Sequence, residues 1–402
     1  MYRIGFDIGG TNIAAGIVDE SLAVTERITR RFEKQSYPGA LAETVAEMTR
    51  MLCQQAELSQ PPAAIGVAVP GSIDPAAECV LNAYNLGLHD VPLRAEVGAH
   101  FPQIPVFLAN DADAAALAEL YGGAFRDAKC AVLFTLGTGV GGGVIVGGKL
   151  WRGGMGHGVE LGHMALDIGG AWCTCGMRGC IETRCAATAL IHAAREALAE
   201  GERGLLFEKT GGDAAKVDAK LVVDCARAGD AGASAIFARF VDALGSAVVS
   251  VIHLLDPEVV AIGGGVSLAG EFLFAPLREN VREKCFFSEF ARIVPARFGN
   301  DAGIVGAAML ERGFMVVPTG VALVAVLVGC LVRRTEARRT CLYKTPCFTA
   351  VKQGILRISE CSADAPCLHH KALLAGFGWA VGAGGKSEHL IVWADDDAFI
   401  DD

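Results

Sequence analysis

The sequence predicts an α/β fold with two related domains that face one another. Residues 4–18 are expected to form a hairpin, in which two apolar strands flank the glycine turn Gly9-Gly10-Thr11. Residues 132–148 repeat this unit, with Ile8 aligning on Leu136 at an offset of 128 positions. A strand–glycine–strand unit that recurs at domain spacing is typical of internal duplication. Helical and strand periodicities also alternate along the chain, which is the pattern of an α/β protein.

The expected elements follow one another from the N-terminus onward. Helical spacing of apolar residues occurs at 39–56, 111–121, 185–199 and 232–255, and short apolar runs typical of strands occur at 64–69, 104–108 and 258–262. Asp256-Pro257 is expected to end the longest helix, because proline cannot continue a helix. The strand that follows opens into a third glycine turn, Gly263-Gly264-Gly265.

Composition limits the classes of partner. The 402 residues are 52% hydrophobic, which is enough for ordinary globular cores. A formal net charge of -10 disfavours nucleic acid, because a phosphate backbone attracts basic proteins. The N-terminus lacks the apolar core of a signal peptide, so a cytoplasmic location is expected. In that reducing compartment, clusters among the 14 cysteines are expected to bind metal rather than to form disulfides.

The glycine turns are expected to bind the phosphates of a nucleotide. Glycine lets backbone N–H groups approach phosphate oxygens, and the hydroxyls of Thr11 and Thr138 can donate to those oxygens. Asp7, before the first turn, is suited to hold Mg²⁺ or its water shell. Plain tight hairpins are the alternative interpretation. A dinucleotide-binding loop is disfavoured, because strand-like residues rather than a helix follow Gly139.

One histidine and three cysteines form a candidate zinc site. They are His163, Cys173, Cys175 and Cys180, all within eighteen residues. Four such ligands complete a tetrahedral shell and leave no position for an activated water, so a structural role is expected. Zinc would fix the loop 160–185, which carries Glu160 and Glu182. Reduced cysteines without a metal are the alternative.

Four segments together resemble the ROK family (repressor, ORF, kinase). They are Asp7-Ile8-Gly9-Gly10-Thr11, Leu136-Gly137-Thr138-Gly139, Glu160-Leu161-Gly162-His163 and the cysteine-containing segment 173–182, and their order and spacing match over nearly all of 1–313. The resemblance implies two RNase H-like lobes of the actin-like ATPase type, with ATP and a sugar in the interlobe cleft. It also implies an ATP-dependent sugar kinase, similar to glucokinase or allose kinase, that phosphorylates a hexose or N-acetylhexosamine at the 6-hydroxyl. A homodimer or homotetramer is expected.

The resemblance implies roles for individual residues. Asp111 corresponds to the base that takes the proton of the sugar hydroxyl, held ionised by a helix N-terminus. From the residues alone, an N-cap is the simpler interpretation of Asp111. The other implied sugar ligands are Gly71, Asn85, Asn110, Glu160, His163 and Glu182. The implied ATP-binding residues are Asp7, Gly9, Gly10, Thr11, Asn12, Gly137, Thr138, Gly139, Gly263, Gly264 and Gly265. His163 would bind zinc through one ring nitrogen and sugar through the other.

The expected domains are a small lobe of residues 1–118, closed by a C-terminal helix at 303–313, and a large lobe of residues 119–302 with the zinc loop. The chain departs from the family pattern at Asp113, at Gly158-Val159 and at Arg184-Cys185. We expect these departures in or beside the sugar pocket, where they leave the reaction intact but favour a substrate other than glucose.

Two other functions are compatible with the resemblance. A sugar-responsive ROK repressor needs an N-terminal helix-turn-helix domain, for which a phosphate turn beginning at residue 7 leaves no room. A non-catalytic sugar-binding protein would not need the combination of Asp7, Thr138 and Asp111. A sugar kinase is therefore the preferred prediction.

Residues 314–402 differ in character from the rest of the chain. Residues 314–332 form an uncharged run rich in Val, Leu and Ala, which is followed by arginines and by a segment without clear periodicity. The run approaches the length of a membrane span, but the arginines after it would place the kinase lobes outside, away from ATP. We therefore expect no membrane partner, and a tail that is not part of the kinase.

Overall fold

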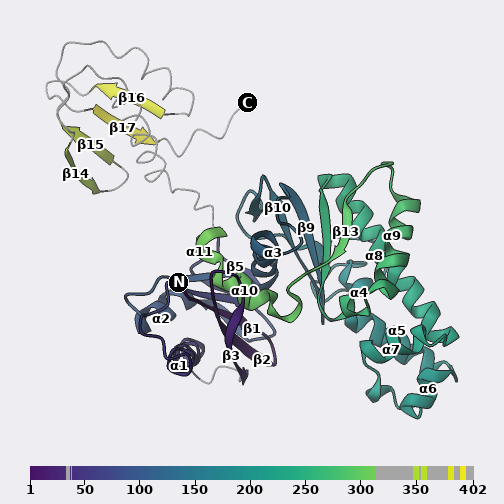
Figure 1. Cartoon of the computed structure of the whole chain (residues 1–402). Coiled ribbons are helices and arrows are strands. Elements are labelled where there is room, and N and C mark those ends of the chain that lie inside the picture. The colour runs from purple at the N-terminus through teal and green to yellow at the C-terminus, as the bar shows by residue number, and fades with distance from the viewer. Residues whose placement is uncertain are drawn as a thin grey trace. The chain divides into compact units, whose positions relative to one another are not determined.

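A computed structural model describes residues 1–32, 37 and 39–313, together with the backbone of four strands between residues 347 and 394. The chain divides into two compact units, Met1–Met315 and Val316–Asp402. Every residue to which the sequence analysis assigns a function lies in the first unit (Figure 1).

The first large sheet has the strand order β3-β2-β1-β4-β8. Its strands are β1 (Arg3–Ile8), β2 (Asn12–Val18), β3 (Val24–Arg31), β4 (Ile65–Val69) and β8 (Val106–Asn110). The first three strands are antiparallel neighbours, whereas β1, β4 and β8 run parallel. The apolar run of β4 is buried along its whole length, as expected of a central parallel strand covered on both faces.

The second large sheet repeats this arrangement with the order β11-β10-β9-β12-β13. Its strands are β9 (Cys130–Leu136), β10 (Val140–Val146), β11 (Lys149–Trp151), β12 (Val259–Gly263) and β13 (Arg292–Pro295). The first three are again antiparallel and the last two parallel to β9. The predicted duplication is therefore confirmed. The ends of β1 and β2 map onto those of β9 and β10 at the offset of 128, although the pairing differs by one residue, with Ile8 opposite Ile13 but Leu136 opposite Val140.

Two helices lie between the large sheets (Figure 1). They are α3 (Asp111–Gly122) and α10 (Ala302–Ala308), and their contact is very close. A Cβ on Gly306 would lie 1.7 Å from the carbonyl oxygen of Ala114, and a Cβ on Gly66 of β4 would lie 1.8 Å from that of Ala307. Only glycine allows this approach, so α10 packs directly against both α3 and β4. The expected helix at 303–313 is divided, because α11 (Leu310–Gly313) begins after Met309.

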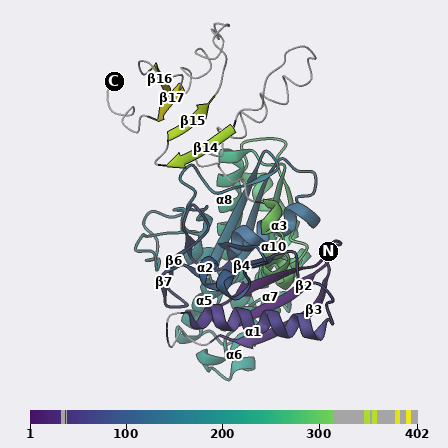
Figure 2. The same ribbon diagram turned by 90° about the vertical axis from the view of Figure 1, so that its left-hand side faces the viewer.

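The outer faces of the two sheets are covered by other helices. On the first sheet, α1 (Ala40–Gln55) and α2 (Leu93–His100) pack over the apolar side chains of the strands, and Figure 2 shows α1 lying along β2 and β3. A small sheet of β5 (Ser72–Ile73), β6 (Val80–Ala83) and β7 (Leu88–Val91) follows β4.

On the second sheet, the covering helices are α5 (Ala187–Ala199), α7 (Ala219–Arg227), α8 (Ala231–Leu255) and α9 (Glu271–Lys284). Short helices complete this half: α4 (Glu182–Cys185), α6 (Leu205–Thr210), η1 (Leu161–His163), η2 (Ala214–Lys216), η3 (Gly265–Ala269) and η4 (Gly299–Asp301). Among the described residues, α8 alone is long and apolar enough to cross a bilayer, but much of it is buried in the core of the second half.

The periodicity predictions are confirmed for α1, α3, α5 and α8 and for β4, β8 and β12, with ends within two residues of those expected. Helix α8 ends at Asp256 in a left-handed conformation, directly before Pro257. The sequence does not predict α9, because Pro276 lies inside it and proline normally ends a helix. The expected domain boundary at 118 falls inside α3, which continues to Gly122.

The second unit contains a four-stranded antiparallel sheet in the order β14-β15-β17-β16. Its strands are β14 (Cys347–Lys352), β15 (Ile355–Ser359), β16 (Trp379–Ala383) and β17 (Leu390–Ala394). The apolar run 314–332 lies outside the described residues, so the interpretation of that run stays a prediction.

Candidate active site

The candidate site lies where the parallel strands of the first sheet end. Asp7 is near the carboxyl end of β1, Gly71 follows β4, Asn110 is the last residue of β8, and Asp111 begins α3. The carboxyl ends of neighbouring parallel strands meet at one edge of a sheet, which is the usual position of a ligand site in α/β folds. The topology therefore brings together residues that are about a hundred positions apart in the sequence.

Asn110 joins the start of α3 to the turn at Gly71. Its side-chain oxygen accepts from the backbone N–H groups of Ala112 at 2.8 Å and Asp113 at 3.3 Å, so Asn110 is the N-cap. Its amide nitrogen donates to the carbonyl oxygen of Gly71 at 3.0 Å. Gly71 has a φ of 107°, and a Cβ there would lie 2.1 Å from the carbonyl oxygen of Asn82. The capping role that the residues alone favoured for Asp111 thus belongs mainly to its neighbour.

Asp111 and Asp7 form a coupled pair of carboxylates. Burial raises the pKa of Asp111, and the N–H of Ala112, which donates to Asp111 at 2.9 Å, opposes that rise only in part. The role of Asp111 as an ionised base stays a prediction, with the backbone N–H of Ala112 favouring the charged form and burial opposing it. Burial, and then the charge of Asp111, raises the pKa of Asp7 to about 6.

The glycine turns are shaped by close backbone contacts. The first turn is closed by the N–H of Gly9, which donates to the carbonyl oxygen of Asn12 at 2.8 Å, and a Cβ on Gly10 would lie 3.9 Å from that of Asn85. Gly264, with a φ of 81°, packs so closely that a Cβ would lie 2.4 Å from the carbonyl oxygen of Leu136. The second and third turns are therefore in direct contact.

Glu182 connects the second phosphate turn with the cysteine cluster. Its Oε2 accepts from the N–H of Val140 at 3.0 Å, and its Oε1 lies 3.8 Å from the Sγ of Cys173. The same turn is held from α5, because the Thr188 hydroxyl donates to the carbonyl oxygen of Thr138 at 2.8 Å. Both oxygens of Glu182 thus have protein partners in this structure, and its expected contact with sugar stays a prediction.

The four predicted zinc ligands are brought together. The ligand atoms of His163, Cys173, Cys175 and Cys180 lie within 4.8 Å of one another. Two pairs, His163 Nδ1 with Cys173 Sγ and Cys175 Sγ with Cys180 Sγ, are each 3.6 Å apart. A tetrahedral zinc with Zn–S bonds of about 2.3 Å separates its ligand atoms by roughly 3.5–3.8 Å, so the donor set fits this ion.

The geometry also distinguishes the two ring nitrogens of His163. Nδ1 faces Cys173, so Nδ1 is the nitrogen suited to a metal. Nε2 on the other side of the ring is the one left for a hydroxyl. Glu160 lies at the start of the same turn, and burial raises its pKa, with Asp111 and Glu182 adding to the rise and His163 opposing it.

Asp113, which is expected in or beside the sugar pocket, lies close to Arg152, which the sequence analysis does not mention. The Asp113 carboxylate is buried within α3, and its Oδ2 lies 3.5 Å from Nε of Arg152. The departure of Asp113 from the family pattern was the one indication in the sequence.

The structure gives the surroundings of Arg184, Cys185 and Val159. Arg184 pairs with Asp167 at 3.1 Å, and Cys185 is buried in the core of the second half. Val159 also packs against that core. The expectation of a substrate other than glucose stays a prediction.

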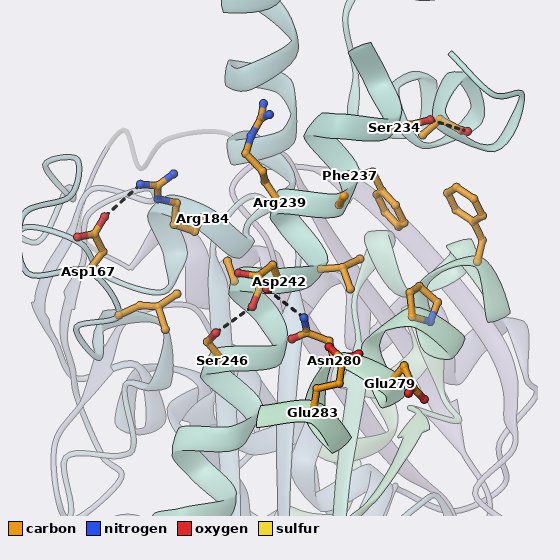
Figure 3. Close-up of a pocket in the computed structure, with 17 residues that line it drawn as sticks. Asp167, Arg184, Ser234, Phe237, Arg239, Asp242, Ser246, Glu279, Asn280 and Glu283 are labelled. Atoms are coloured by element: carbon orange, nitrogen blue, oxygen red, sulfur yellow. Dashed lines mark hydrogen bonds and ion pairs between the residues drawn. The ribbon is translucent and has the colours of Figure 1, made fainter. Parts of the chain in front are cut away.

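Figure 3 shows a cavity of about 1050 Å³, whose lining includes no residue of the three glycine turns. It is formed mainly by α8 and α9, and Figure 3 shows Asp242 at its centre with Asn280 donating to it at 3.0 Å. Arg184 and Asp167 lie at one side of this cavity. None of the predicted catalytic, sugar-binding, ATP-binding or zinc-binding residues lines it.

Comparison with known proteins is consistent with this geometry. A family model described as the ROK family matches residues 3–313. A glucokinase from Thermotoga maritima is 39% identical over 319 residues, covering 78% of this chain and 98% of the relative. An N-acetylmannosamine kinase from Escherichia fergusonii is 31% identical over 314 residues, covering 78% and 99%. The crystal structure of a ROK glucokinase from Streptomyces griseus with glucose and AMPPNP has a TM-score of 0.68 and 32% identity, covering 78% and 99%.

Proposed function

Because this chain belongs to the ROK family, we propose that it transfers the γ-phosphoryl group of ATP to a hydroxyl of a hexose or an N-acetylhexosamine. The observation that carries this proposal is the position of Asp111. It lies at the carboxyl ends of the parallel strands β1, β4 and β8, and its charge raises the pKa of Asp7 beside the first phosphate turn. ATP as phosphoryl donor is supported by the glucokinase relatives and by the AMPPNP complex of the Streptomyces griseus enzyme.

Asp111 acts as the base in this proposal. Its ionised carboxylate takes the proton of the attacking sugar hydroxyl, which in this proposal is the 6-hydroxyl. The hydroxyl oxygen forms a bond to the γ-phosphorus while the bond between that phosphorus and ADP breaks. Phosphoryl transfer needs mainly alignment and neutralisation of charge, so one positioned base with fixed backbone donors is sufficient protein chemistry. Asn110 fixes the start of the helix that carries Asp111.

Asp7 is the residue that would hold Mg²⁺. Its carboxylate is largely buried, and the neighbouring charge of Asp111 opposes its ionisation. A divalent cation stabilises such a carboxylate in its charged form and, when bound, neutralises charge on the phosphates. The other proposed nucleotide contacts are the backbone groups of the three glycine turns.

The zinc cluster has a structural role in this proposal. Its four ligands leave no open position, so the metal orders the loop that carries Glu160, His163 and Glu182. Glu182 of that loop also accepts a hydrogen bond from the N–H of Val140, which lies next to the second phosphate turn.

A coupled assay of ATP consumption tests the proposal. The purified protein is supplied with Mg-ATP and, separately, with glucose, allose, mannose, fructose, N-acetylglucosamine and N-acetylmannosamine. Sugar-dependent release of ADP is expected with at least one of them, and glucose is the first to test, given the relative with 39% identity. The phosphorylated position is read from the product by NMR.

Two results would favour the alternative functions. Sugar binding by calorimetry without ADP release would indicate a non-catalytic binding protein. Sugar-dependent binding to DNA would indicate a repressor, which the acidic composition disfavours. Light scattering of the same sample tests the expected homodimer or homotetramer.

Removal of the tail is expected to preserve the enzyme. The family match ends at residue 313, and residues 1–315 form a compact unit without the tail. A chain ending at Gly313 should therefore be soluble, keep kcat and KM for the sugar, and aggregate less, because the apolar run 314–332 is absent. A chain ending at Asp301, which lacks α10, is the control and should not fold, because α10 packs between the two sheets. Loss of folding or activity on cutting at Gly313 would assign the tail to the kinase.

A further inference from the structure

A buried ion pair connects three segments around the candidate sugar pocket. Asp113 lies two residues after Asp111 in α3, with only 2% of its side chain exposed, and Arg152 follows β11 with 12% exposed. A carboxylate that is removed from water is costly unless a cation or hydrogen bonds compensate it. The Nε of Arg152, 3.5 Å from Asp113 Oδ2, supplies the opposite charge.

The guanidinium of Arg152 also contacts three consecutive carbonyl groups. One terminal nitrogen donates to the carbonyl oxygens of Ile73 at 3.4 Å and Asp74 at 3.3 Å, and the other donates to that of Pro75 at 3.5 Å. These residues follow Gly71 through β5. The rigid fork of an arginine suits such simultaneous contacts better than a lysine would.

The third segment is the glycine-containing approach to Glu160. Gly158 has a φ of 99°, and a Cβ there would lie 3.9 Å from Asp113 Oδ2. Gly156, two residues earlier, has a φ of 75°, and a Cβ there would lie 3.1 Å from the Cβ of Pro75. The segment before Glu160 therefore packs against both Asp113 and the segment that Arg152 holds.

We propose that Asp113 and Arg152 form a latch that holds residues 71–75 and 158–160 in place around the sugar, so that Asp113 is a positioning residue for sugar binding. This inference rests on the proposed sugar-kinase function, and it assigns the pair Asp113 and Arg152 a role in sugar binding. The distances and burial carry the assignment, because one guanidinium binds the carboxylate of α3 and the carbonyls that follow Gly71 at the same time.

The latch is expected to depend on pH. Burial raises the pKa of Asp113 to about 7, with the charges of Asp111 and Glu160 adding to the rise and Arg152 opposing it. The ion pair is therefore complete above about pH 7 and is lost as the pH falls below that value. A hexose has no charge of its own that changes in this range, so a change in its binding reports on the protein.

Asp113→Asn tests the latch through the affinity for sugar. In the wild type, KM for the sugar that the panel identifies should rise as the pH falls from 8 to 6. In the variant, KM at pH 8 should be about three- to tenfold higher and nearly constant across this range, with a smaller change in kcat. Asp224→Asn, which removes a carboxylate from an exposed ion pair on α7, is the control and should match the wild type.

A double-mutant cycle with Arg152→Met completes the test. If the two residues act as one latch, the effects of Asp113→Asn and Arg152→Met on KM will not add. Additive effects, or an unchanged KM in Asp113→Asn at pH 8, would overturn the latch while leaving the kinase proposal intact.

Hydrogen exchange supplies a readout that needs no sugar. At pH 8, a peptide covering residues 71–80 should exchange faster in Asp113→Asn than in the wild type, whereas peptides of α8 should not differ. Equal exchange in residues 71–80 would overturn the latch. An absence of phosphorylation with every sugar of the panel would count against the proposed function, and the exchange experiment would still decide the latch.

Discussion

Replacement of Asp111 by Asn is expected to lower kcat by about 10²- to 10⁴-fold, the range typical of losing a positioned general base. Asn keeps the size of the side chain and can still accept from the N–H of Ala112, but it cannot take a proton from the sugar hydroxyl. The N-cap of α3 is Asn110, so the fold and the binding of ATP should be retained. Steady-state kinetics, a melting curve and calorimetry with an ATP analogue measure the three properties.

Asp218→Asn is a matched control for this experiment. Asp218 caps α7 and accepts from the N–H of Leu221 at 2.7 Å, far from any residue assigned to the reaction. Asn caps helices as well as Asp does, so turnover and stability should be unchanged. Near-normal turnover in Asp111→Asn would remove Asp111 from the role of base.

The pH profile supplies a second check on Asp111. Burial raises its pKa, and the base works in its ionised form, so wild-type kcat should fall as the pH decreases through a value above the usual range of aspartate. The residual activity of Asp111→Asn should lack this step. An acid limb identical to that of the wild type would show that another group is responsible.

Loss of zinc is expected to have the second large effect. Wild-type protein should contain about one zinc per chain, and Cys175→Ser should release it, because one thiolate of a closed shell is gone. The loop with His163 and Glu182 should then loosen, and kcat/KM should fall at least about tenfold. Because Glu182 accepts from the N–H of Val140, affinity for an ATP analogue should fall together with affinity for sugar.

Metal analysis, calorimetry and hydrogen exchange of residues 137–140 measure these changes. Cys53→Ser is the control, since Cys53 is another free cysteine and lies on α1, outside the cluster. It should keep its zinc and its activity. Wild-type protein without zinc would refute the cluster as a metal site, and retained ATP-analogue affinity in Cys175→Ser would refute the connection through Glu182.

The amino-acid sequence by itself determines features that depend on local spacing. The zinc ligands lie within eighteen residues, so their residue types and separations are enough to predict the cluster. The glycine turns are recognised in the same way, because each one directly follows a short apolar run. Apolar periodicity within a single segment predicts each of the major helices. The duplication is recognised because one hairpin pattern recurs at an offset of 128 positions.

Only the tertiary structure decides features that depend on residues far apart in the chain. The pKa shifts of Asp7 and Asp111 arise from burial at the shared edge of β1 and β8, which no local pattern measures. The pairing of Arg184 with Asp167, 17 residues away in the chain, likewise follows from packing. The contacts of Arg152 with Asp113 and with the carbonyls of 73–75 require the two halves to be folded together. Electrostatics and close packing act through space, so spacing along the chain could not predict them.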